Sequence, residues 1–298
     1  MMKRLIAAMP EDIEPARRLE AETGLPLAEI GVHKFPDGES LVRAPAAAET
    51  VFLYCSLNDP NGKLVDLGLA ASALREAGAK RLVLIAPYLC YMRQDKAFHP
   101  GEAVAQRFIG ALLAQWFDRV ITVEPHLHRT KTLTAIMPGI ESSALPAAEL
   151  LAALIRRDGE VAADILVVGP DAESQSWTSS VAAAAGAAFM ILAKHRSGDR
   201  DVSILAQETE NIAGKHVYLV DDIVSTGATL SAAASLLKRY GAARIDALVV
   251  HALFNKADEK RMLEAGIASI RSTDTVAHET NAIEISPLLA AIVEKDEA

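Results

Sequence analysis

The sequence VYLVDDIVSTGATL, from Val217 to Leu230, decides how the rest of this chain is interpreted. Its first four residues are apolar, which is typical of a buried strand in a parallel sheet. Two carboxylates, Asp221 and Asp222, follow this strand, at the edge where open α/β sheets bind their ligands. The sequence therefore predicts a ligand site at the carboxyl end of a parallel strand.

The residues that follow the two carboxylates suit a phosphate group. They are small or carry hydroxyls: Ser225, Thr226, Gly227, Ala228 and Thr229. Backbone N–H groups and hydroxyls can donate to phosphate oxygens, and Gly227 permits a close approach of the backbone. A helix that starts near Thr229 adds the positive end of its dipole. A phosphate monoester is expected in this loop, with the carboxylates holding two sugar hydroxyls or a metal bound to them. The simpler interpretation, an acidic pair that ends a strand and caps a turn, leaves this spacing unexplained.

Length, charge and cysteine content describe an acidic globular protein. The 298 residues suggest about two domains, and 51% of them are hydrophobic. A net charge of −9 without a run of Lys or Arg argues against nucleic acid as a main partner. Cys55 and Cys90 lie in apolar stretches and are expected to be buried thiols in a reducing compartment. No stretch is long and apolar enough for a signal peptide or a membrane span, so a cytoplasmic protein without a membrane partner is expected.

Apolar strands alternate with amphipathic helices along the chain, which is the pattern of an α/β fold. Strands are predicted at residues 4–8, 30–34, 41–43, 51–55, 82–86, 120–123, 165–168, 188–192, 217–220, 245–250 and 269–271. Helices are predicted at residues 13–22, 64–77, 104–115, 146–156, 174–185, 230–240, 257–265 and 287–294. The segments 77–81 and 240–244 resemble each other, which hints at two copies of one unit. Pro138, Gly139 and two serines interrupt the pattern, so domains of 1–140 and 141–298 are expected.

Two polar segments of the first half suit a nucleotide. In HKFPDGES, residues 33–40, Phe35 would lie against a base, while Asp37 and Glu39 would face the purine edge or its ribose; a plain hairpin turn is the simpler interpretation. After the strand at 82–86 come Arg93, Gln94 and Asp95. Arginine suits bidentate capture of phosphate and a glutamine can read a base edge, although a solvated polar loop explains the same residues.

Further polar residues follow other strands of the expected sheets. His126 could bind a metal or donate to a phosphate, and His128 is a weaker candidate. Asp171 could be a second metal ligand, or only the N-cap of the next helix. Lys194 and Arg196 lie in a basic segment that is either an exposed hairpin or a loop that closes over a transferring phosphoryl group. The chain has neither a P-loop nor a dinucleotide fingerprint, so ATP would need a different device.

The late run resembles the motif that type I phosphoribosyltransferases and phosphoribosyl pyrophosphate (PRPP) synthetases share, and the ordered set of segments resembles the ribose-phosphate pyrophosphokinase family. The resemblance implies two domains of the phosphoribosyltransferase kind, each with a five-stranded parallel sheet flanked by helices. It implies ATP at Phe35–Glu39, Arg93–Asp95 and His126, and ribose 5-phosphate at Asp221–Thr229. It also implies Mg²⁺ at His126 and Asp171, catalytic roles for Lys194 and Arg196, and self-association that completes the ATP site.

The family's reaction is attack of the C1 hydroxyl of ribose 5-phosphate on the β-phosphorus of ATP, which gives PRPP and AMP. Such a transfer needs positioning and charge neutralisation more than a covalent intermediate. Glu124 and Pro125 depart from the family pattern, which has an aspartate near its histidine. A PRPP-dependent phosphoribosyltransferase would share only the late run, and a non-catalytic regulator is expected to have lost loop residues. Both alternatives therefore fit the ordered set less well.

Overall fold

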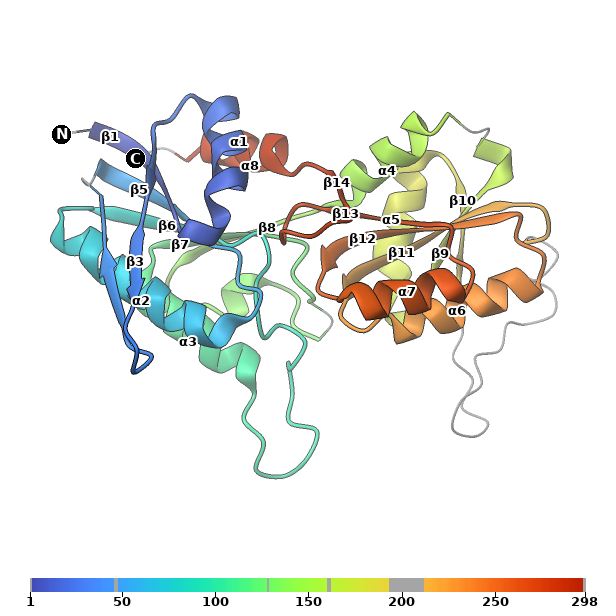
Figure 1. The fold of residues 1–298 in the computed structure, drawn as a ribbon, viewed down its shortest axis with the longest axis horizontal. Helices are drawn as coiled ribbons and strands as arrows, with labels where there is room; N and C mark the ends of the chain where they lie inside the picture. The colour runs from blue at the N-terminus through green and yellow to red at the C-terminus, as the bar shows by residue number, and fades with distance from the viewer. Residues whose placement is uncertain (1, 46–47, 128, 160–161, 193–211, 297–298) are drawn as a thin grey trace. The chain divides into compact units, whose positions relative to one another are not determined.

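A computed structural model describes residues 2–45, 48–127, 129–159, 162–192 and 212–296 of the chain. The chain divides into two compact units. The first contains Met1–Leu145 together with Ile285–Ala298, and the second contains Pro146–Glu284. Each unit is an α/β sandwich built on a six-stranded parallel sheet (Figure 1).

The sheet of the first unit has the strand order β2-β1-β5-β6-β7-β8. Its strands are β1 (Met2–Ala8), β2 (Leu27–Glu29), β5 (Ala48–Tyr54), β6 (Arg81–Ile85), β7 (Arg119–Val123) and β8 (Glu141–Leu145). Its helices are α1 (Ile13–Thr23), α2 (Pro60–Glu76), α3 (Ala105–Trp116) and α8 (Ser286–Val293), with short 3-10 turns at Pro10–Asp12 and Leu133–Ala135. Helices α1 and α8 pack together on one face of the sheet, and α2 and α3 cover the other (Figure 1). The central strands β5 and β6 are almost wholly buried, as expected for parallel strands covered on both faces.

The second unit repeats this plan with the strand order β10-β9-β11-β12-β13-β14. Its strands are β9 (Ile165–Gly169), β10 (Ala188–Ile191), β11 (His216–Val224), β12 (Arg244–Ala252), β13 (Ser269–Thr273) and β14 (Asn281–Ile283). Its helices are α4 (Ala148–Arg157), α5 (Gln175–Ala185), α6 (Ala228–Arg239) and α7 (Lys256–Glu264), with 3-10 turns at Ala162–Asp164 and Ala172–Ser174. Helices α4 and α5 pack together, as do α6 and α7 on the opposite face (Figure 1).

The two similar linkers adopt the same helix end, which supports the internal repeat. Gly78 has φ +105° and Gly241 has φ +83°, so both occupy the left-handed region where glycine is favoured. Ala79 N donates to Leu74 O at 3.0 Å, and the equivalent bond of Ala242 ends on a carbonyl of α6 at 3.1 Å. These bonds satisfy the last carbonyls of each helix before the chain enters the next strand.

A separate antiparallel hairpin lies between β2 and β5 in the chain. It consists of β3 (Gly31–Lys34) and β4 (Ser40–Arg43), which pair only with each other among the described strands. The hairpin at residues 33–40 is therefore confirmed, and β4 packs against α2.

Each sheet has six strands, and not the five that the resemblance implied. Two further features of the fold differ from the sequence-based expectation. The serines near residue 140 belong to β8, an edge strand of the first unit, and not to a break between domains. The last helix, α8, also packs on α1 of the first unit, so the units differ from the expected 1–140 and 141–298. An edge strand is half exposed and therefore tolerates polar residues such as these serines. The sequence of an apolar helix shows that it will be buried, but it does not show which of the two sheets the helix will cover.

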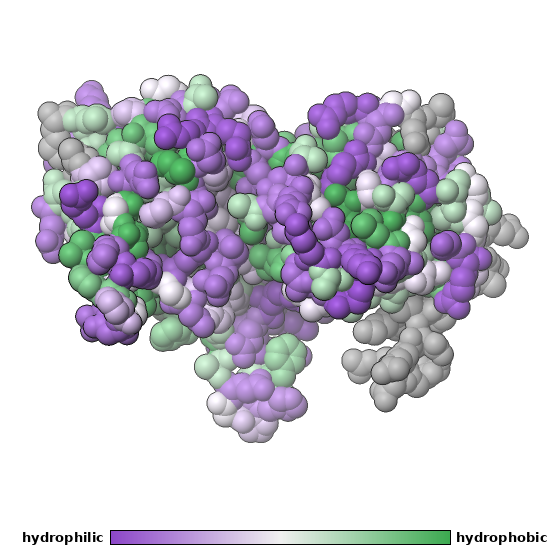
Figure 2. Space-filling view, in the orientation of Figure 1, coloured by the Kyte–Doolittle hydropathy of each residue, from purple (hydrophilic) through white to green (hydrophobic). Residues whose placement is uncertain are grey.

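The surface of each unit is mostly hydrophilic with scattered hydrophobic residues, as Figure 2 shows for one face. No helix within the described ranges is long and apolar enough to cross a membrane. Cys55 and Cys90 are buried free thiols, as expected, and burial raises the pKa of both.

Candidate active site

Strand β11 carries the acidic pair to the carboxyl edge of the second sheet. It is longer than predicted and continues through Asp221 and Asp222 to Val224. Asp221 is still paired with Val249 of β12, whereas the pairing of β11 with β9 ends at Leu219. The acidic pair therefore lies just beyond the end of β9, at the edge where ligands bind in such sheets.

The carboxylates at this edge crowd one another. Burial raises the pKa of Asp221 well above its usual range, and the negative charges of Asp222 and Asp171 raise it further. Two backbone N–H groups donate to this acidic pair: Asp222 N donates to Asp221 Oδ1 at 3.0 Å, and Ile223 N donates to Asp222 Oδ1 at 2.7 Å. Asp222 and Asp171 thus raise the proton affinity of Asp221, and a buried acidic cluster of this kind favours a cation or hydroxyl donors.

Gly227 shapes the loop that follows β11. It has φ +67° and is the N-cap of α6, which begins at Ala228, next to the expected start near Thr229. A Cβ on Gly227 would lie 2.4 Å from Sδ of Met262, so this position has neither the backbone conformation nor the space for a side chain. No side chain caps α6, and Thr226 and Thr229 are exposed. The loop thus offers hydroxyls beside the positive end of a helix, as a phosphate site requires.

Asp171 follows β9 and caps the next turn. Its Oδ1 accepts hydrogen bonds from Glu173 N at 3.0 Å and from Ser174 N at 3.2 Å. Gly169, at the end of β9, leaves room for this turn, because a Cβ there would lie 2.3 Å from Ser174 Oγ. The capping interpretation is therefore confirmed, and the influence of Asp171 on the pKa of Asp221 places its charge close to the acidic pair.

In the first unit, the tip of the β3–β4 hairpin presents the expected base-binding residues to solvent. Phe35 is 40% exposed, and Asp37 and Glu39 are exposed as well. Phe35 N donates to Glu39 O at 2.9 Å, and Glu39 N donates to Asp37 Oδ1 at 3.1 Å. Gly38, with φ +92°, closes the turn. The tip is thus held in one shape by its own hydrogen bonds.

Arg93, Gln94 and Asp95 lie in the long segment between β6 and α3, which projects from the first unit (Figure 1). Arg93 is exposed. The side chain of Asp95 is only 4% exposed. Both of its carboxylate oxygens accept hydrogen bonds from Nη1 of Arg129, at 2.9 and 3.1 Å. Sequence analysis missed Arg129, because nothing in its local pattern points to a partner 34 residues away.

His126 lies just after β7, and the backbone before it is strained. Glu124 has φ +39°, an uncommon conformation for a residue with a side chain. Two further non-glycine residues with positive φ, Asp59 and Tyr91, follow β5 and β6. All three lie after the carboxyl ends of neighbouring parallel strands, and such strain gathers at functional sites.

The remaining predicted residues are divided between the two units or lie outside the described residues. Lys194, Arg196 and His128 lie outside the described residues. His126 belongs to the first unit and Asp171 to the second. Within the described ranges, no three His, Cys, Asp or Glu side chains converge closely enough to hold a metal ion by themselves.

Comparisons with known proteins agree with this arrangement along the whole chain. Residues 5–116 match the family model of the N-terminal domain of ribose phosphate pyrophosphokinase, and residues 139–283 match a phosphoribosyl transferase domain. A ribose-phosphate pyrophosphokinase of Methanopyrus kandleri is 34% identical over 97% of this chain and 98% of the relative. One from Pyrococcus abyssi is 30% identical over 91% of this chain and 92% of the relative.

A solved structure supports the same fold. The phosphoribosylpyrophosphate synthetase of Mycobacterium smegmatis matches with a TM-score of 0.81 over 98% of both chains, at 24% sequence identity. Because the two family models and the curated relatives cover both units in order, the chain belongs to the ribose-phosphate pyrophosphokinase family.

Proposed function

We propose that the chain transfers the β,γ-pyrophosphoryl group of ATP to the C1 hydroxyl of ribose 5-phosphate. The second unit would bind ribose 5-phosphate and the first unit the nucleotide. The observation that carries this proposal is the acidic pair at the end of β11 followed by the loop at Gly227, in a chain related to pyrophosphokinases over nearly its full length.

In the second unit, the backbone and hydroxyls of Ser225–Thr229 would hold the 5-phosphate at the start of α6. Asp221 and Asp222 would orient the ribose hydroxyls from the opposite side of the loop. This leaves the C1 hydroxyl as the free nucleophile of the bound sugar. The new bond forms between O1 of the ribose and the β-phosphorus, the bond from the β-phosphorus to the bridging oxygen of AMP breaks, and the proton of the C1 hydroxyl passes to solvent. Most of the rate enhancement would come from in-line positioning and neutralised charge.

Mg²⁺ would be the cofactor. The carboxylate oxygens of Asp221, Asp222 and Asp171 are the kind of ligand that a hard cation prefers, and water and substrate phosphates would complete its shell. Asp171 and His126 are proposed as ligands of the cation, Asp171 through the oxygen that does not cap the turn. Bound Mg²⁺ would neutralise phosphate charge. Lys194 and Arg196 would stabilise the charge that develops on the transferring group.

In the first unit, Phe35, Asp37 and Glu39 would contact the adenine and its ribose, and Arg93 and Gln94 the nucleotide beside them. Asp95 would act through Arg129, since its carboxylate is already paired there. The exposed position of Phe35 supports self-association, in which the hairpin of one copy completes the ATP site of another. The buried free thiols support a reducing, cytoplasmic location.

The test is a direct assay of the purified chain. Ribose 5-phosphate, ATP and Mg²⁺ are supplied, and AMP and PRPP are measured; equal amounts of the two products are expected. A second reaction with PRPP and a free nucleobase checks for phosphoribosyl transfer, which is not expected. Product in the second reaction alone would identify a transferase, and no product in either would identify a non-catalytic protein.

An Asp222→Asn variant checks that the activity comes from the proposed site. It should raise the KM for ribose 5-phosphate more than the KM for ATP, because Asp222 would hold the ribose hydroxyls, whereas the nucleotide would bind to the first unit. The matched control is Asp164→Asn, on the 3-10 turn at the opposite end of β9, which should leave both constants unchanged.

A further inference from the structure

The β3–β4 hairpin is attached to the first unit in an unusual way. Its strands pair only with each other among the described strands, so no backbone ladder connects the hairpin to the main sheet. The tip is ordered by internal hydrogen bonds, and β4 packs on α2. The position of the tip relative to the sheet therefore depends on side-chain contacts with α2.

A groove separates the tip from α2. A cavity of about 420 Å³ is lined by Lys34 and Glu39 of the hairpin and by Gly62, Val65 and Leu69 of the helix. Val65 is 61% exposed and Leu69 41% exposed. Apolar packing thus does not seal the tip against the helix.

One ion pair crosses from the hairpin to the helix. Nζ of Lys34 lies 2.7 Å from Oδ2 of Asp66 and 2.8 Å from Oγ of Ser40. Lys34 and Ser40 face each other in the last register of the hairpin, directly before and after the tip. The ammonium therefore joins both strands of the hairpin to α2 at the base of the tip.

The helix side of this pair is buried. The side chain of Asp66 is only 10% exposed, whereas that of Lys34 is 54% exposed. Oδ1 of Asp66 is buried and has no hydrogen-bond partner among the described residues. Removing the lysine would leave a buried carboxylate without its counter-charge, which is a costly arrangement. The pair is thus a stronger tie than an exposed surface ion pair.

We propose that Lys34 and Asp66 are positioning residues that hold the hairpin tip in place for ATP. The inference depends on the proposed role of Phe35, Asp37 and Glu39 in binding the nucleotide. It assigns no contact with substrate to the pair itself. Loss of the pair should weaken ATP binding through misplacement of the tip, without affecting ribose 5-phosphate.

The experiment measures the KM for both substrates in a set of full-length variants. Asp66→Asn and Lys34→Met should each raise the KM for ATP about tenfold, a displacement effect of the kind that small misplacements produce. The KM for ribose 5-phosphate should stay within about twofold of the unmodified chain. Lys34→Arg, which keeps the charge and can still reach a carboxylate, should restore most of the ATP affinity.

Two further variants make the result decisive. Lys80→Met removes the exposed pair with Glu49, 2.8 Å apart on the same unit, and should change neither KM. Phe35→Ala tests the ATP role of the tip itself. If Phe35→Ala raises the KM for ATP while Lys34→Met and Asp66→Asn do not, the positioning role is refuted and the ATP site stands. If Phe35→Ala leaves the KM for ATP unchanged, the assignment of the tip to ATP fails, and the positioning role fails with it.

Discussion

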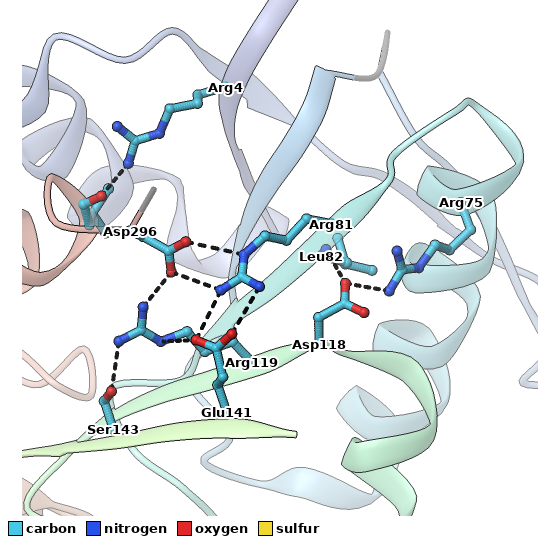
Figure 3. A network of polar contacts seen from close by, with 10 residues as sticks. Arg4, Arg75, Arg81, Leu82, Asp118, Arg119, Glu141, Ser143 and Asp296 are labelled. Carbon is cyan, nitrogen blue, oxygen red and sulfur yellow. Dashed lines mark hydrogen bonds and ion pairs between the residues drawn. The ribbon is translucent and has the colours of Figure 1, made fainter. Parts of the chain in front are cut away.

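Arg81 and Asp296 join distant parts of the chain within the first unit: Nε of Arg81 lies 3.1 Å from Oδ1 of Asp296, although 215 residues separate them (Figure 3). Arg119 of β7 donates to the other oxygen of the same carboxylate. The side chain of Asp296 is completely buried. Two arginines from neighbouring strands thus hold the segment after α8 against the edge of the sheet where these strands begin.

Replacing Asp296 with Asn should destabilise the first unit. The change removes the shared counter-charge of two arginines, and breaking a buried pair typically costs about 3–5 kcal/mol. Chemical unfolding measures the loss as a lower denaturant midpoint. Glu49→Gln, which removes an exposed pair, is the control and should change the midpoint little. Equal midpoints for the two variants would show that the buried carboxylate does not hold the C-terminal segment.

Asp12 should make the stability of the first unit depend on pH. Burial raises the pKa of its carboxyl from the ordinary 3.8 to about 6, while Lys63 and a hydrogen bond from Ser56 N oppose the shift. Between about pH 4 and 6 the folded chain holds this proton and the unfolded chain does not. The contribution of Asp12 therefore falls as the pH rises through this window, by at most about 1.4 kcal/mol per pH unit.

Asp12→Asn removes this titration and keeps an acceptor for Ser56. Unfolding free energies measured from pH 4 to 7 should then fall less steeply for the variant than for the unmodified chain. Parallel curves for the two proteins would contradict the raised pKa.

Gly227→Ala should damage the ribose 5-phosphate site. A Cβ at this position would approach Met262 to 2.4 Å, in a backbone conformation with φ +67°. Displacement of the loop is expected to lower kcat/KM for ribose 5-phosphate roughly 10–100-fold. Gly186→Ala is the matched control, because it has φ +69° but no atom within 4 Å of the new Cβ, so it carries the strain without the contact. Adding Met262→Ala to Gly227→Ala should recover part of the activity; no recovery would point to backbone strain alone.

Lys194→Ala should lower kcat about 10²–10³-fold with little effect on either KM, because a charge that stabilises the transferring group acts in the transition state. Steady-state kinetics separate the two constants. Lys80→Ala, at an exposed ion pair of the first unit, is the control. A nearly normal kcat for Lys194→Ala would remove this lysine from the catalytic role.

Much of the architecture could be predicted from the sequence because buried parallel strands are apolar without interruption. All eight predicted helices and the central strands of both sheets exist, with ends that differ by a few residues. The strands that were missed are β2, β8 and β14, and all three are edge strands. An edge strand is covered less, so its sequence is shorter and more polar, as in Glu141–Leu145.

The local conformation of the late loop could also be predicted, because Asp221, Asp222 and Gly227 are close together in the chain and this conformation depends on the local backbone. The tertiary structure alone decided what lies far apart in sequence. It placed α8 on the first unit, paired Asp95 with Arg129, and joined Lys34 to Asp66. An ion pair between residues more than 30 positions apart cannot be recognised in the sequence pattern. Each partner resembles an ordinary solvated charge until packing of the fold removes it from water.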